Sequence, residues 1–288
     1  MSKAKILKKR LNRSWAGNSI INIILIFFGI FMVLPMVFTI SASLKPLDEF
    51  WIFPPRFLPI NPTTDNFADL MRYMGDSRVP FGRYIFNTVF VAVVGTFGHV
   101  ILSSMCAYAF TKHNIPGGKA MFTMVVTALM FNTVVTQVPN FLLISKLGMM
   151  DTYWALIIPA FASPLGMYLM KQFMEQMVPD EILEAARIDG SSEMRMFFRI
   201  VMPMVKPAWL TLIIFSFQGL WNTGSTMYIY SEHLKTLNYA LSQIVAGGIA
   251  RTGVSAAATV VMLIVPILLF ILVQSNVVET MSTSGMKG

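Results

Sequence analysis

Neutral hydrogen-bonding side chains recur in two otherwise apolar segments of the chain. Amides and hydroxyls donate and accept hydrogen bonds without carrying charge, and an indole ring offers a face for stacking. The set therefore suits a ligand with many hydroxyl groups and an apolar ring face, and as a whole it favours a polar path through the protein. Hydrogen bonding between packed helices is the simpler interpretation of any single member. The residues are Asn132, Thr136, Gln137 and Asn140 in the first segment and Gln218, Trp221 and Asn222 in the second.

Ionisable groups are nearly absent from the apolar segments. His99 is the only histidine in these segments, and no carboxylate, lysine or arginine accompanies it there. A proton relay or an intramembrane catalytic site needs further ionisable groups, so we predict no catalytic residue and interpret His99 as a hydrogen-bonded packing residue. The 23 methionines do not cluster with cysteine or histidine as a metal site requires. We therefore expect no metal site.

Six long apolar segments must position these polar side chains. The chain is 55% hydrophobic and only 12% charged, and its mean hydropathy is +0.64, which is too apolar for a soluble domain. Each segment is close to the roughly 20 residues that a helix needs to cross about 30 Å of hydrocarbon. The sequence predicts an all-α integral membrane protein with six transmembrane helices. They cover approximately residues 19–43, 84–110, 120–144, 152–170, 208–230 and 254–275.

The distribution of lysine and arginine predicts the orientation. Residues 1–18 hold six basic and no acidic residues, which places this end in the cytoplasm and next to anionic lipid rather than nucleic acid. The apolar run of 19–43 is too long for a cleaved signal peptide, so we interpret it as a retained first helix. Alternation then places loop 44–80 outside the membrane. The polar loop 179–207 and the tail 276–288 are expected in the cytoplasm.

Loop 179–207 contains residues that typically begin and end helices, and their positions predict two short helices. Pro179 suits a first helical turn because it has no amide donor to leave unpaired. Gly190 permits the left-handed conformation that ends a helix, and Ser191 or Ser192 can cap the next one. Pro203 removes a donor and disfavours helix before it, so the second helix should end near Val201.

The first of these helices has the composition of a docking surface. Ala185 and Ala186 leave the backbone accessible, so that a second protein can approach it closely, while Glu184 places a charge beside them. We therefore expect another protein to bind here.

The spacing in this loop resembles the EAA loop of ATP-binding-cassette (ABC) importer permeases, with the pattern EAA-x3-G-x9-I-x-L-P. The only departure is a methionine in place of leucine, a volume-conserving change. The stretch from Ala186 to Ser191 resembles the carbohydrate, maltose-type branch in particular. Similar fragments occur in the same order from about Phe81 to the end of the chain, including Asn87-Thr88 and Asp151-Thr152. The matching residues of the loop are Glu184, Ala185, Ala186, Gly190, Ile200 and Pro203, and Met202 is the departure.

This resemblance implies the type I ABC importer permease fold, with a five-helix core over residues 81–275 preceded by an added first helix. It implies a permease subunit of an ATP-driven, binding-protein-dependent sugar importer, with an oligosaccharide as the expected cargo. One chain then forms half of the translocation pore in a bacterial inner membrane, with both termini cytoplasmic. The residues carried over to ATPase coupling are Glu184, Ala185, Ala186, Asp189, Gly190 and Pro203.

The implied partners are a homologous second permease, two cytoplasmic ABC ATPase subunits, an extracytoplasmic solute-binding protein, the carbohydrate and membrane lipid. A phosphate-binding loop is missing, because Gly118-Lys119 is followed by Ala120 and lacks the glycine five residues before it. ATP and magnesium are therefore expected on the partner ATPases, and this chain should hold no cofactor. Polyamine, phosphate or peptide import is an alternative, but a charged cargo favours charged path residues. An intramembrane enzyme or a receptor is a further alternative.

Overall fold

The computed structural model describes residues 15–75, 79–131, 133–224, 227–246, 248 and 251–284. The described residues fold into helices joined by short turns, without a strand, which confirms the all-α prediction. Four helices are long and apolar enough to cross a membrane: Ser19–Ser43, Phe81–Lys112, Trp154–Met177 and Thr252–Gln274. A fifth span is present if Glu193–Met204 and Lys206–Trp221, which meet at 83°, are counted as one.

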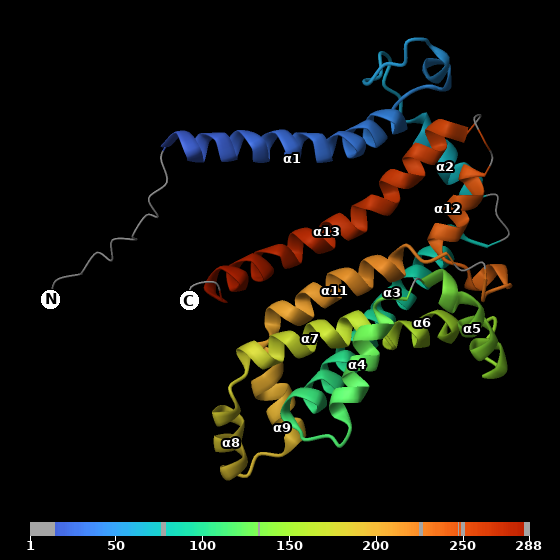
Figure 1. Cartoon of the computed structure of the whole chain (residues 1–288). Helices are drawn as coiled ribbons and strands as arrows, with labels where there is room; N and C mark the ends of the chain where they lie inside the picture. The colour runs from blue at the N-terminus through green and yellow to red at the C-terminus, as the bar shows by residue number, and fades with distance from the viewer. Residues whose placement is uncertain are drawn as a thin grey trace.

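The long helices lie side by side (Figure 1). Helix α3 (Phe81–Lys112) is central and packs against α6 (Trp154–Phe161), α7 (Pro164–Met177) and α11 (Lys206–Trp221). Helix α13 (Thr252–Ser284) packs against α11 on one side and against α1 (Trp15–Ser43) on the other. The rest of α1 is exposed apolar surface, as a helix surrounded by lipid requires.

Two groups of short helices mark opposite ends of this bundle (Figure 1). At one end lie the start of α1, the end of α13, α8 (Asp180–Ile188) and α9 (Glu193–Met196). At the other end lie α2 (Asp65–Gly75) and α12 (Leu237–Val245). We call these the inner and outer ends, following the predicted orientation. The alternation expected from the sequence is therefore consistent with the arrangement of the elements.

The apolar segment 120–144 is not one helix. It forms α4 (Gly118–Ala128) and α5 (Thr133–Lys146), and three successive turn hydrogen bonds close α4 at Leu129, Met130 and Phe131. At 1.5 Å per residue, α4 and α5 are only about 17 Å and 21 Å long. Uniform hydropathy does not show such a break, so the count of six spanning helices remains a prediction.

Segment 152–170 also divides, into α6 and α7. Pro164 begins α7, and the Ser163 hydroxyl caps it by accepting a hydrogen bond from the amide of Gly166 at 3.3 Å. This proline and cap explain why the helix restarts here, because the proline cannot continue the preceding helix but suits a first turn.

Side-chain hydrogen bonds hold the outer loop after α1. Asn66 donates from its amide nitrogen to the carbonyls of Ser43 and Lys45, at 2.9 Å and 2.7 Å. The carboxylate of Glu49, in the short helix η1 (Leu47–Trp51), accepts the backbone amides of Ile60 and Asn61. These bonds fold the loop back onto the start of α2.

Candidate functional site

Helix α8 begins and ends where the sequence predicted. It starts directly after Pro179, and Gly190 closes it with a φ of 78°. The amide of Ser191 donates to the carbonyl of Ala186 and the amide of Gly190 donates to that of Arg187, each at 3.0 Å. This pair of bonds is the Schellman motif, in which a left-handed glycine satisfies the last carbonyls of a helix.

The second helix of the loop extends beyond its predicted end. After α9 the chain widens into a π-helical turn, Phe197–Val201, and continues as α10, Met202–Met204. Pro203 lies in the first turn of α10, where its missing amide leaves no hydrogen bond unmade. The expected end at Val201 is therefore wrong, and the helical path ends at Val205 instead. We call residues 179–204 the inner knob.

Both ends of α8 are fastened to α3. At its start, the Lys112 ammonium donates to the Asp180 carboxylate and to the carbonyl of Val178, each at 2.6 Å. At its end, the Glu193 carboxylate accepts Arg187 Nε at 2.9 Å and the Tyr108 hydroxyl at 2.7 Å. These contacts join α8, α9 and α3 into one unit.

The charge on Glu193 is stabilised in this position. The hydrogen bond from Arg187, followed by that from Tyr108, holds the pKa of the Glu193 carboxyl below its usual value. The imidazole of His113 lies 3.5 Å from the same carboxylate. Sequence reasoning missed Glu193, because Tyr108 lies 85 residues away from it in the chain.

The outward face of α8 combines carboxylates with apolar side chains. Glu184, Ala185 and Asp189 are exposed, and Ile188 is 87% exposed beside them. An apolar side chain this exposed at a polar end is typical of a docking surface. Ala186 departs from its prediction: it is only 9% exposed and packs into the core with Leu183, so it seats α8 rather than meeting a partner.

Two of the predicted path residues meet at one cavity. Thr136 and Asn140 of α5 line a space of about 560 Å³ between α3, α5, the α6–α7 break and α11. Gln137, Gln218 and Asn222 are exposed but do not line this cavity. Asn132 lies outside the described residues.

Trp221 does not have the role that its sequence position suggested. Its side chain is 2% exposed, stacks on Phe217, and donates from Nε1 to the carbonyl of Met262 at 3.0 Å. Because both the ring face and the N–H are occupied within the bundle, Trp221 joins α11 to α13 and is unavailable to a ligand.

The cavity has polar residues that sequence reasoning did not assign to it. His99, Ser163 and Ser216 also line it, each from a different element. Spacing along the chain gives no signal for this set, since the three belong to helices brought together by packing. Among the described residues, no three metal-binding side chains cluster anywhere.

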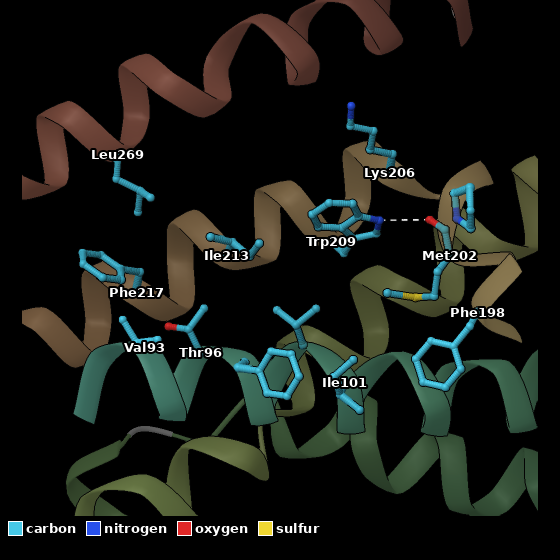
Figure 2. A pocket seen from close by; sticks show the side chains of 13 residues that line it. Val93, Thr96, Ile101, Phe198, Met202, Lys206, Trp209, Ile213, Phe217 and Leu269 are labelled. Carbon is cyan, nitrogen blue, oxygen red and sulfur yellow. Dashed lines mark hydrogen bonds between the residues drawn. The ribbon is translucent and has the colours of Figure 1, made fainter. Parts of the chain in front are cut away.

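A second cavity, of about 720 Å³, is an apolar groove between α3 and α11 (Figure 2). Phe217, Ile213 and Thr96 face it, and Leu269 of α13 reaches towards it from the opposite side. Trp209 donates to the carbonyl of Met202 at 2.9 Å at one end of the groove. Because its lining is almost wholly apolar, the groove does not suit a hydrated ligand.

Polar contacts also fasten the outer end of α3. Asn87 donates to the carbonyls of His233 and Lys235, at 2.9 Å and 2.8 Å, and accepts the Tyr153 hydroxyl at 2.7 Å. The next residue, Thr88, accepts the amide of Leu237 at 2.7 Å. Every polar atom of the buried Asn87 side chain therefore has a partner.

Asp151 completes this outer fastening from the loop before α6. Its carboxylate accepts the amides of Tyr230 and Ser231, at 2.9 Å and 2.8 Å, together with the Ser231 hydroxyl. The hydroxyl and then the amide of Ser231 lower the pKa of Asp151 from its ordinary value. We call Asn87, Thr88 and Asp151 the outer brace.

Comparison with known proteins gives one consistent result. Residues 10–283 match the family described as "Binding-protein-dependent transport system inner membrane component". The chain is 32% identical to a polygalacturonan/rhamnogalacturonan transport system permease protein of Bacillus subtilis, over 72% of this chain and 69% of that one. It is 28% identical to an arabinooligosaccharides transport system permease protein of Halalkalibacterium halodurans, over 91% and 94%.

A solved structure has the same fold. A chain of a bacterial ABC transporter involved in the import of the acidic polysaccharide alginate superposes with a TM-score of 0.76. The alignment covers 92% of this chain and 99% of that one at 21% sequence identity, so it supports the architecture alone.

Proposed function

Because this chain belongs to the family of binding-protein-dependent transport system inner membrane components, we propose that it forms half of the pore of an oligosaccharide importer. It is a multi-pass membrane protein and a permease subunit of a sugar importer, as its relatives are. The observation that carries the finer proposal is the inner knob. It is fastened to α3 at both ends of α8 and presents an exposed face beyond the spans.

The knob is suited to transmit force. A cytoplasmic ATPase that binds Glu184, Ala185 and Asp189 pulls on α8, and the Lys112 and Glu193 contacts pass this displacement to α3. Gly190 and Pro203 keep the knob compact, and Ala186 holds it on the core. ATP binding and hydrolysis on two partner ATPases then move the spans between outward-open and inward-open states. ATP and magnesium are bound by those partners.

The remaining partners follow from the two ends of the bundle. A homologous second permease supplies the other half of the pore. The solute-binding protein delivers cargo at the outer end, where α2, α12 and the outer brace lie. The basic residues of segment 1–18 support a cytoplasmic location for both termini and for the inner knob.

The cavity lined by Thr136 and Asn140 supports a carbohydrate cargo. Neutral hydroxyls and amides recognise sugar hydroxyls, whereas a polyamine or peptide favours charged partners. The sugar-transporting relatives do not favour those alternatives, or an intramembrane enzyme.

The test uses this chain in proteoliposomes with its partner permease, ATPases and binding protein. ATP-dependent uptake of labelled raffinose, arabinotriose and digalacturonate is measured. We expect Glu184→Lys and Gly190→Pro to abolish uptake and ATPase copurification while leaving membrane insertion normal. Lys119→Glu, a charge reversal at the exposed start of α4 and outside the inner knob, is the matched control. The proposal fails if the coupling variants import normally, or if vesicles containing only this chain accumulate the sugars.

A further inference from the structure

Four buried side-chain atoms in the described part of the chain have no hydrogen-bond partner. They are Thr96 Oγ1, His99 Nε2, Ser103 Oγ and Ser216 Oγ. All four belong to the middle of α3 and of α11, away from the inner knob and the outer brace. An unpaired polar group in an apolar interior costs on the order of 1–3 kcal/mol, and a bilayer core offers no water to relieve it.

Other buried hydroxyls on the same helix show that partners were within reach. The hydroxyl of Thr88 donates to the carbonyl of Tyr84 at 2.9 Å, and that of Ser104 donates to Val100 at 2.6 Å. A serine or threonine in a helix can make this bond to the preceding turn. The side chains of Ser103 and Ser216 do not make it, so their hydroxyls remain available.

Two of the four residues lie at the 560 Å³ cavity. His99 and Ser216 line it from α3 and α11, and their side chains are only 6% and 8% exposed. None of the lining residues that the structure describes is an aspartate, glutamate, lysine or arginine. Phe131, Phe215 and Pro159 supply apolar walls. A cavity of this volume with few polar groups among apolar walls is typical of a small-molecule site.

We propose that His99 and Ser216 form a subsite for one neutral sugar ring of the cargo and determine its specificity. This inference rests on the proposed function. A sugar hydroxyl both donates and accepts, so it satisfies either tautomer of a neutral imidazole and the Ser216 hydroxyl together. The ring faces lie against the aromatic and proline walls. The absence of charge from the lining selects a neutral ring over a uronate.

Gly166 positions the imidazole. A Cβ at Gly166 would lie 2.3 Å from His99 Nε2 and 2.7 Å from Ser103 Oγ. The first turn of α7 therefore packs directly on His99 and closes one side of the subsite. Both distances are too short for a Cβ, so Gly166→Ala must shift the imidazole or the first turn of α7 and change the subsite.

The first experiment measures uptake by the complete importer in proteoliposomes with the same three labelled sugars. We expect His99→Leu and Ser216→Ala each to lower Vmax/KM for raffinose or arabinotriose by about 3- to 30-fold, as loss of a ligand hydrogen bond predicts. ATPase activity stimulated by the binding protein should stay unchanged.

His99→Gln, which keeps a donor and an acceptor, should restore part of the uptake, and Gly166→Ala should resemble His99→Leu. Ser104→Ala is the matched control, because that hydroxyl is already paired within α3.

The second experiment does not depend on how these variants fold. In a Cys106→Ser background, the thiol introduced by Ser216→Cys should react with a water-soluble methanethiosulfonate in the assembled importer. A transported neutral sugar should slow that reaction.

The inference is overturned if the thiol of the Ser216→Cys variant is unreactive or unprotected, if the uptake variants match wild type, or if digalacturonate is imported in preference to the neutral sugars. None of these results contradicts the proposed function, provided that the wild-type complex imports at least one of the sugars. Failure of the wild-type complex to import any of the three contradicts the proposed function instead.

Discussion

Two stretches of α3 are equally buried but differ in how their polar groups are satisfied. At the outer end, Asn87 is fully buried and makes three hydrogen bonds to loops that follow α11 and precede α6. About three turns later, His99 and Ser103 are almost as deeply buried, and neither His99 Nε2 nor Ser103 Oγ has a partner in the described structure. The difference indicates two roles. The outer brace stabilises the fold, and the polar groups in the middle of α3 are available to bind a ligand.

The largest effect on stability is expected at the outer brace. Asn87→Leu removes three buried hydrogen bonds, which should cost roughly 3 kcal/mol. Among the described residues, the His233 carbonyl and the Tyr153 hydroxyl then keep only their bonds from Arg83, at 3.2 Å and 3.3 Å. Denaturation of the purified protein in detergent measures this cost. His99→Leu is the counterpart. It removes Nε2, which has no partner in the part of the chain that the structure describes, and it should be neutral or stabilising. Equal destabilisation by both changes would erase the distinction between the two stretches.

A smaller effect is expected at the inner knob. Glu193→Gln keeps the shape but removes the charge that Arg187 and Tyr108 stabilise, which should cost about 1 kcal/mol because the site is half exposed. Uptake should also fall, because one of the two attachments of α8 to α3 is weakened while the Lys112 attachment remains. A double-mutant cycle with Arg187→Gln measures the coupling. Additive effects of the two changes would show that the contact does not join the helices.

The outer brace should also give an acid-dependent stability. Hydrogen bonds lower the pKa of Asp151 below its ordinary value of 3.8, so the folded state holds this carboxylate ionised. Its contribution is fully present above the ordinary value and is lost as the pH falls through the folded-state value. Thermal midpoints measured from about pH 6 to about pH 3 should fall more steeply for wild type than for Asp151→Asn. Parallel curves would contradict this assignment.

The smallest effect is expected from Ser104→Ala, which removes one hydroxyl already bonded within its own helix. The helix keeps its backbone bonds, so the cost should stay below about 1 kcal/mol in the same denaturation assay. A larger loss would mean that Ser104 has a further role, and it could then no longer serve as the control for Ser216.

The backbone preferences of proline and glycine predicted the two ends of α8 in the inner knob. The position of Pro179 and the left-handed Gly190 depend only on backbone sterics of single residues, so the sequence placed both ends of α8 correctly. The same reasoning failed at Pro203, because a π-helical turn changed the hydrogen-bond pattern before it. Ala186 was assigned to the surface, since composition alone does not say which side of a short helix meets the core.

The path residues were harder to predict. Thr136 and Asn140 reach the cavity, but Trp221 is enclosed by Phe217 and Met262, and no pattern within α11 indicates that enclosure. The break between α4 and α5 was also missed, because hydropathy is uniform across it.

The sequence by itself determined that this is a helical membrane permease of the importer family, because hydropathy, charge placement and the EAA spacing are properties of neighbouring residues. Tertiary structure alone decided which polar groups are paired. Tyr108 with Glu193 and Asn87 with His233 lie 85 and 146 residues apart in the chain. The packed bundle brings His99 and Ser216 to one cavity, where His99 Nε2 and Ser216 Oγ have no hydrogen-bond partner among the described residues. A hydrogen bond depends on distance in space, and only the packed bundle sets that distance.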